Sequence, residues 1–155
     1  MNAKVLTARD IMQPRDSLTV LRVEATVFSA IKLFTKHKIS GAAVVNAEGD
    51  VIGVLSELDC LRELASDEFY DAEQFEEQLV GDLMTKDPHT IDTAMDIYAV
   101  ADFFVTKGVR RLPVLEGGRL VGQVSRRDVL RGVEQMRKKR ITRKVYPDYP
   151  RPPMP

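Results

Sequence analysis

Two segments of this chain repeat one another, and this duplication constrains the fold more than any other feature of the sequence. Four ordered blocks match: Asp10-Ile11-Met12 with Asp82-Leu83-Met84, Thr19-Val20 with Thr90-Ile91, Val44-Val45 with Val114-Leu115, and Gly53-Val54-Leu55-Ser56 with Gly122-Gln123-Val124-Ser125. The offset between the copies falls from 72 to 69 residues along the chain, as expected when single residues are lost in surface loops. We therefore predict a tandem duplication of one structural unit.

Each copy shows the same order of predicted elements. The first has a strand at 19–21, a helix at 25–36, strands at 42–45 and 51–55, and a helix that begins after Ser56. The second has a strand at 90–91, a helix at 96–106, strands at 112–115 and 119–124, and a helix from Arg126. A unit of about 55 residues is too small to bury a good core alone. We therefore predict an α/β fold of the α+β type, in which two pseudo-symmetric β-α-β-β-α repeats share a core.

The repeats divide the chain into four parts. We assign residues 6–65 to the first repeat, 66–79 to an acidic insert, 80–135 to the second repeat and 136–155 to a basic, proline-rich tail. The insert carries Phe69, Tyr70, Phe75 and Leu79, which predicts a loop and short helix whose aromatic side chains pack on the body. Five of the last nine residues are proline, so we expect the tail to be extended.

The charged residues are segregated, although they balance overall. The chain has 23 Lys and Arg against 23 Asp and Glu, a formal net charge of zero. The stretch from Asp59 to Asp82 carries a net charge of −8, and the stretch from Arg119 to Arg151 carries +8. Such separation indicates either a partner or contact between the two stretches, within one chain or between two copies.

The composition excludes several classes of protein. The single cysteine, Cys60, leaves no internal disulfide and no multi-cysteine zinc site, and its apolar helix face predicts a small core residue. His37 and His89 are isolated, and His37 is interpreted as a solvated residue at a helix end. The sequence contains no phosphate-loop, dinucleotide-loop, zinc-protease or nucleophile-elbow motif. We therefore expect neither an enzyme nor a metal site.

Location and macromolecular partners are inferred from further missing signals. No stretch approaches the roughly 18 uninterrupted apolar residues of a membrane-spanning helix, so we expect no membrane segment. Residues 1–10 lack the apolar core of a secretory signal, which with the lone cysteine predicts a cytoplasmic location. The basic run at 137–140 lacks interleaved aromatic residues, so we do not expect nucleic acid as a partner.

A Ser-x-x-Asp motif follows the last strand of both repeats, from Ser56 to Asp59 and from Ser125 to Asp128. One interpretation is structural, because a Ser N-cap with an acid three residues later resembles a capping box for the following helix. The other is functional, because a helix N-terminus offers free amides to an anion and a nearby Asp can accept hydrogen bonds from a ribose. The spacing alone leaves both interpretations open.

Together these motifs resemble the tandem cystathionine-β-synthase (CBS) domain pair, also called a Bateman module. The resemblance covers residues 6–135. It rests on Arg9-Asp10-Ile11-Met12 and Gly81-Asp82-Leu83-Met84, on Gly108 to Val114, and on the paired segments Gly53 to Asp59 and Gly122 to Asp128. It implies two lobes related by a pseudo-twofold axis, with two clefts that each draw residues from both repeats.

The resemblance also implies which residues line each cleft. For the first cleft it implies Thr19, Val20, Ile39, Ser40, Gly41, Arg111, Gln123, Val124, Ser125, Arg126 and Asp128. For the second it implies Val54, Ser56, Asp59, Thr90, Ile91, Val109 and Arg110. In the family the Asp takes the ribose hydroxyls, the Ser and nearby basic groups take phosphate, and apolar strand residues sandwich the adenine.

By the same resemblance, the ligand is an adenosine compound: AMP, ADP, ATP, S-adenosylmethionine or NAD. It would be a regulatory ligand, and no cofactor is obligatory. The implied function is a non-catalytic sensor that forms a homodimer and signals to a separate effector protein through a change in conformation or dimer geometry. The alternative is a structural dimerisation module with vestigial clefts.

Residues next to the two motifs predict unequal clefts. Arg126 and Arg127 follow Ser125, whereas Glu57 occupies the place equivalent to Arg126 in the first repeat. Because arginine binds phosphate through a charged, two-pronged donor, we expect the first cleft to bind the more anionic ligand and the second to bind weakly or stay empty. The arginines could instead serve solubility or pair with Asp102 or Glu116.

Overall fold

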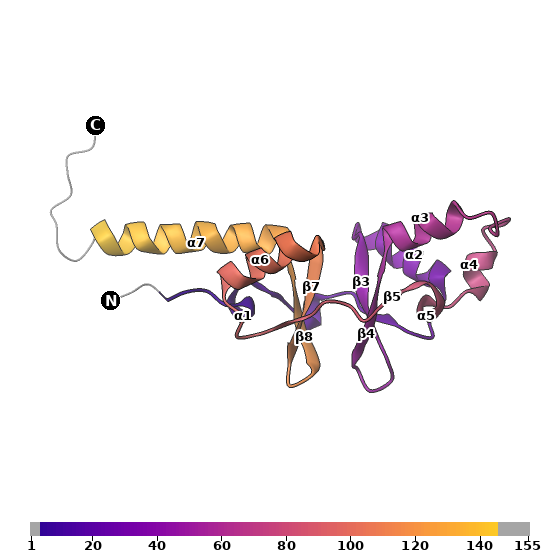
Figure 1. Ribbon diagram of the computed structural model, residues 1–155, viewed down its shortest axis with the longest axis horizontal. Coiled ribbons are helices and arrows are strands. Elements are labelled where there is room, and N and C mark those ends of the chain that lie inside the picture. The colour runs from indigo at the N-terminus through magenta and orange to yellow at the C-terminus, as the bar shows by residue number, and fades with distance from the viewer. Residues whose placement is uncertain (1–3, 146–155) are drawn as a thin grey trace.

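The computed structural model describes residues 4–145, with side chains as far as residue 139, and contains two α/β halves that lie side by side (Figure 1). The elements in chain order are α1 (Ala8–Ile11), β1 (Gln13–Pro14), the 3-10 helix η1 (Arg15–Ser17), β2 (Leu21–Arg22), α2 (Val27–His37), β3 (Gly41–Val45), β4 (Val51–Ser56), α3 (Glu57–Leu64), α4 (Gln74–Glu77), α5 (Val80–Leu83), β5 (Thr85–Lys86), β6 (Ile91–Asp92), α6 (Ile97–Lys107), β7 (Arg111–Glu116), β8 (Arg119–Ser125) and α7 (Arg126–Val145). Each β-α-β-β-α unit appears as the repeat predicts, and the α/β class is confirmed.

The two halves begin and end their central helices in the same way. The side chain of Thr26 accepts a hydrogen bond from the Ser29 amide at the start of α2, and the Asp96 side chain accepts one from the Ala99 amide at the start of α6. Both helices then end on a residue in the left-handed conformation, Lys38 in the first half and a glycine in the second. Equivalent caps at equivalent positions are the local signature of the duplication.

The structure adds an exchange of strands that the sequence analysis missed. One sheet has the order β2-β3-β4-β5 and the other β1-β8-β7-β6. In the second sheet β1 pairs with β8 through Gln13 and Gln123, and in the first sheet β5 pairs with β4 through Lys86 and Gly53. The opening segment of each repeat therefore completes the sheet of the other half. A two-residue strand is too short to show a periodic pattern, so nothing in the sequence signals these strands.

Three clusters of buried side chains hold the molecule together. The first half packs Leu21, Phe34 and Leu55 with their neighbours, and the second half packs Ile97 and Leu112 with theirs. A third cluster lies where the sheets face each other in the middle of the molecule (Figure 1), with the buried side chains Ala43, Val45 and Leu120. This third cluster is the predicted shared core, and it leaves room beside it for the cavities described below.

The acidic insert packs only part of its aromatic surface. Phe75 in α4 is buried, and its ring lies 4.8 Å from that of Phe69, as predicted. Tyr70 is 85% exposed, so the prediction was wrong for this aromatic residue. Its amide donates a hydrogen bond to the Gln74 side chain at 2.6 Å, in the exposed turn that precedes α4.

The described parts of the acidic and basic stretches lie at opposite ends of the molecule. Figure 1 shows α4 at one end, while α7 extends past the other end with its basic residues. The two stretches therefore do not neutralise each other within one chain over residues 4–145. Residues 136–145 of the predicted tail are not extended but continue α7, and the proline-rich part, 146–155, lies outside the described residues. Over residues 4–145, no helix is both long enough and apolar enough to cross a membrane.

Candidate functional site

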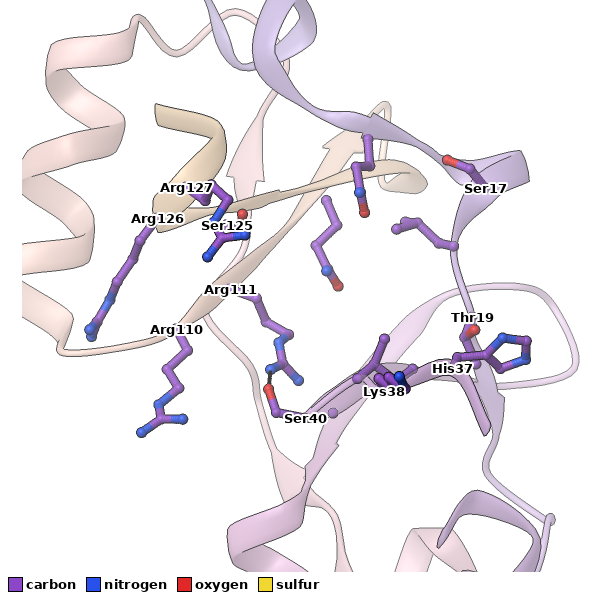
Figure 2. Close-up of a pocket in the computed structure, with 15 residues that line it drawn as sticks. Ser17, Thr19, His37, Lys38, Ser40, Arg110, Arg111, Ser125, Arg126 and Arg127 are labelled. Carbon is purple, nitrogen blue, oxygen red and sulfur yellow. Dashed lines mark hydrogen bonds between the residues drawn. The ribbon is translucent and has the colours of Figure 1, made fainter. Parts of the chain in front are cut away.

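Two cavities lie between the halves, one on each side of the contact between the sheets. The first has a volume of about 800 Å³. Figure 2 shows Thr19, His37, Lys38 and Ser40 on its first-half side, with a row of arginines and Ser125 opposite. The full lining is Gln13, Ser17, Leu18, Thr19, His37, Lys38, Ile39, Ser40, Gly41, Arg110, Arg111, Gln123, Ser125, Arg126 and Arg127.

The structure brings together most of the residues that the resemblance implies for the first cleft. Those at the first cavity are Thr19, Ile39, Ser40, Gly41, Arg111, Gln123, Ser125 and Arg126. Val20, Val124 and Asp128 lie outside its lining. Successive side chains of a strand point to opposite faces, so Gln123 and Ser125 face the cavity while Val124 enters the core. Val20 packs in the cluster between the sheets.

The second cavity has a volume of about 710 Å³ and mirrors the first. Of the residues implied for it, Val54, Ser56, Asp59, Val109 and Arg110 line it, and Thr90 and Ile91 do not. Ile91 is a buried core residue of the second half. The remaining lining residues are Ser40, Glu57, Leu58, Leu61, Thr85, Lys86, Asp87, Pro88, His89, Gly108 and Arg111.

Both Ser-x-x-Asp motifs form capping boxes. The Asp59 carboxylate accepts hydrogen bonds from the Ser56 amide at 2.9 Å and hydroxyl at 3.1 Å, and the Ser56 hydroxyl oxygen accepts one from the Asp59 amide at 3.3 Å. Ser125 and Asp128 repeat the arrangement at 2.8, 2.9 and 3.3 Å. The structural interpretation therefore holds in both repeats.

The amides at these helix starts are also less available than the anion-binding interpretation assumed. The Glu57 amide, the first of α3, donates to the Ser40 carbonyl at 2.8 Å. The Asp59 amide is taken by the cap. These two amides of α3 are therefore not available to a phosphate in the second cavity.

Each capping Asp uses one carboxylate oxygen for the cap and turns the other elsewhere. The oxygen of Asp59 that is not used by the cap, Oδ1, accepts a hydrogen bond from the Thr85 hydroxyl at 3.2 Å. Asp59 lines the second cavity. Oδ1 of Asp128 accepts one from the Arg131 guanidinium at 3.2 Å. The cap and a ligand would engage different oxygens, so the two interpretations of the motif do not exclude each other.

The two cavities differ in charge as the neighbouring residues predicted. Within the described residues, no acidic side chain lines the first cavity. Five cationic side chains line it: Lys38, Arg110, Arg111, Arg126 and Arg127. The second cavity balances Lys86 and the same Arg110 and Arg111 against Glu57, Asp59 and Asp87. The suggested pairing with Glu116 is not formed by these arginines, because Glu116 pairs with Arg9 instead.

The sequence analysis missed the histidines and the segment before β2. His37 lines the first cavity as well as facing solvent, and His89 lines the second, with its ring centroid 5.7 Å from that of Phe103. Ser17 and Leu18 also reach the first cavity. The repeat aligns Leu18 with His89, so these two positions could have been proposed as equivalent lining residues. Neither a leucine nor a histidine alone indicates a ligand site.

Cys60 takes no part in either cavity. It is buried in the core of the first half, as predicted, and burial raises the pKa of its thiol to about 11, with Asp59 and Glu57 adding to the effect.

Comparison with known proteins agrees with this architecture. The CBS domain family matches residues 8–66 and 80–135. The chain belongs to the CBS domain family. Two uncharacterized proteins of Methanocaldococcus jannaschii are 30% and 28% identical to this chain, over 79% and 84% of its length. The match spans 41% of the length of the first and 92% of the second.

Solved CBS structures share the fold over most of the chain. The crystal structure of CBSX2 in complex with AMP has a TM-score of 0.74 at 29% identity, covering 84% of this chain and 97% of that one. CBSX2 is a chloroplastic CBS domain-containing protein of Arabidopsis thaliana, 27% identical over 85% of this chain and 65% of its own length. The ATP-bound CBS domain of a bacterial CNNM/CorC magnesium transporter, at 24% identity and a TM-score of 0.72, shows the fold alone.

Proposed function

We propose that this CBS pair is a non-catalytic regulatory module that binds an adenosine nucleotide between its repeats. The observation that carries the proposal is the first cavity, where five cations line a space of about 800 Å³ without an opposing acid. An isolated group of cations in a concave site favours a phosphorylated ligand. The AMP complex of CBSX2, a protein of the same fold, supports adenosine monophosphate as the first ligand to test.

Within the first cavity the residues divide by chemistry. Ile39 and Leu18 offer apolar surface suited to a base, and Arg126 and Arg127 stand at the opposite wall with Ser125. We assign phosphate binding to these basic residues and to Ser125. The Arg126 guanidinium already donates to the Val109 carbonyl at 3.1 Å, which holds its stem in place beside the cavity.

A role for Asp128 in ribose binding requires a rearrangement. Its Oδ1 would have to exchange the Arg131 guanidinium for a sugar hydroxyl. Arg131 is largely exposed, but the Asp128 carboxylate is buried, so the side chains that cover it must also move. Asp59 needs less change, because it already lines the second cavity.

The charge of the first cavity ranks the candidate ligands. ADP, ATP and NAD carry phosphates that its cations can bind, whereas S-adenosylmethionine has no phosphate and carries a positive sulfonium, so it is the least favoured. The mixed charges of the second cavity support weaker binding of a phosphorylated ligand there. The alternative, a dimerisation module with vestigial clefts, is less favoured because both cavities are large and lined with polar groups.

We also propose a homodimer that reports to a separate effector. Leu61 and Leu64 on α3 are equivalent to Leu130 and Val133 on α7, and all four side chains are about half exposed or more. Exposed apolar surface repeated on two helices favours association. Enzymatic activity is not part of the proposal. For location we propose the cytoplasm on the basis of the lone buried thiol, although the Arabidopsis relatives include chloroplastic proteins.

The proposal is tested by thermal unfolding with AMP and with adenosine. A ligand that binds only the folded form stabilises it by about 2.7 kcal/mol at a hundred times its Kd, which is roughly 5–10 °C for a domain of this size. We expect AMP to raise the Tm, adenosine to raise it much less, and Arg127→Ala to reduce the effect of AMP.

Arg119→Ala is the matched control. Arg119 is an exposed arginine at the turn end of the β7–β8 hairpin, where its backbone lies opposite that of Glu116, and it lines neither cavity. This variant should respond to AMP as the wild type does. A wild-type Tm that does not change with AMP would refute the proposed function.

A further inference from the structure

The two cavities share a wall. Ser40, Arg110 and Arg111 line both of them, and the other lining residues each belong to one. Figure 2 shows the Arg111 side chain reaching from the second half to Ser40 in the first. Any movement of these side chains toward one cavity therefore withdraws them from the other.

Arg111 reaches this position because of the residue opposite. It is the first residue of β7, and its guanidinium donates a hydrogen bond to the Ser40 hydroxyl. Gly41 follows Ser40, and a Cβ there would collide with that guanidinium and lie 2.7 Å from the Leu55 carbonyl oxygen. The missing side chain of Gly41 thus provides the space through which Arg111 crosses between the halves.

The charge of Arg111 is poorly matched where it lies. Within the part of the chain that the structure describes, Arg111 joins no ion pair, and its one hydrogen-bond acceptor is a neutral hydroxyl. Partial burial lowers its pKa, the nearby Arg110 lowers it further, and Glu57 of the second cavity acts in the opposite direction. Arginine nevertheless stays charged, so the wall between the two cavities holds a partly buried cation that could bind an anion from either side.

We propose that Arg111 is a single anion-binding side chain shared by both cavities, so that a phosphorylated ligand in one cavity weakens binding in the other. This inference rests on the proposed function. One planar guanidinium presents its two-pronged face to one phosphate at a time. The coupling is reciprocal, since each ligand must lower the affinity of the other by the same factor.

The charges also decide which cavity fills first. With Arg111 turned to a phosphate in the first cavity, that ligand also meets Lys38, Arg126 and Arg127. The second cavity then keeps Arg110 and Lys86 against its three acids. We expect the first ligand to bind the first cavity and to leave the second unfavourable for phosphate.

Isothermal titration with AMP tests the coupling. The double variant Lys38→Ala/Arg127→Ala weakens the first cavity through residues that do not line the second, and it adds no carboxylate that Arg111 could bind instead. We expect its second cavity to bind AMP at least about fivefold more tightly than the second step of the wild type, at the low end of usual allosteric factors. We call the quotient of these two affinities the coupling ratio. When Arg111→Gln is added to the wild type and to the double variant, the coupling ratio should fall to about one.

The variants distinguish the shared side chain from simpler causes. Arg111→Gln keeps an amide beside Ser40 while it removes the charge, and Arg111→Lys keeps the charge but loses the fork, so it should retain part of the coupling. Arg119→Gln is the control and should leave the ratio unchanged. A ratio that persists in Arg111→Gln, or equal affinities at both wild-type cavities, would overturn the inference and leave the proposed function standing. A wild type that binds no AMP would refute both.

Discussion

At the scale of single residues, the capping pairs show how one side chain can serve stability and leave room for function. Ser125 and Asp128 close the start of α7 through Oδ2, while Oδ1 points to an exposed arginine. Asp128 is nevertheless buried, so the cap is its first role. A cap of this kind contributes about 1 kcal/mol. Duplication preserved the cap in both repeats, whereas the flanking charges diverged.

Cys60 gives a prediction about reactivity. The thiolate is the reactive form, and burial raises the pKa of this thiol from 9.0 to about 11. A maleimide should therefore fail to label the native protein at neutral pH and should label it after denaturation. Rapid labelling of the native protein would show that the core around α3 opens readily.

The same shift makes stability depend on pH at the alkaline end. A raised pKa in the folded state contributes stability that is fully present below pH 9 and is lost as the pH rises through about 11. Urea unfolding should show a larger loss between about pH 8 and pH 10 for the wild type than for Cys60→Ala, which has no thiol to ionise.

At the scale of elements, the exchanged strands β1 and β5 are what tie the halves into one unit. Each lies against a glycine of the strand it joins, Gly122 in β8 and Gly53 in β4. A Cβ at Gly122 would lie 2.6 Å from the Gln13 carbonyl oxygen, and one at Gly53 would lie 2.9 Å from the Thr85 carbonyl oxygen. These glycines recur in the repeat because both strands must approach a sheet closely.

Gly122→Ala tests this account. The added methyl group meets the Gln13 carbonyl oxygen, which is backbone and cannot swing aside, so we expect a loss of about 1–3 kcal/mol in the free energy of unfolding, measured in urea. Met12 also touches the site through its sulfur, and Met12→Ala in the same chain should not restore the loss. Full recovery in the double variant would show that the side chain, not the exchanged strand, causes the conflict.

At the scale of the whole molecule, the segregated charges bear on assembly. The acidic insert around α4 and the basic part of α7 lie at opposite ends (Figure 1), so one chain does not bring them together within its described residues. A second copy placed side by side in the same orientation would set like charges against each other. A copy in the opposite orientation would bring the acidic insert against basic α7, and the exposed aliphatic residues of α3 and α7 would meet.

Salt should therefore weaken the proposed dimer. Raising ionic strength from about 0.05 to 0.5 M shortens the screening length to a few ångströms and removes most attraction between exposed charges. Sedimentation of the protein at several concentrations should show a larger dissociation constant at high salt. Association that is independent of salt, or that strengthens with it, would contradict an opposed arrangement.

Much of the fold follows from local patterns in the sequence. The helices α2 and α6 have apolar residues at helical spacing and recognisable caps, so their predicted bounds differ from the observed ones by only one or two residues. The hairpins of β3–β4 and β7–β8 are equally local. The exchanged strands could not be predicted, because a two-residue strand forms only where a distant sheet edge offers hydrogen bonds.

The sequence by itself determined the duplication, the family, the paired caps and the unequal charges beside them, since all of these depend on residue identity and short spacing. Only the tertiary structure decided which residues share a cavity. In the tertiary structure Val124 and Ile91 lie in the core of the second half, and His37 and His89 line the first and second cavities. Arg111 reaches across to donate a hydrogen bond to Ser40. Such contacts join residues about 70 positions apart, and they depend on how the two sheets face each other rather than on any local preference.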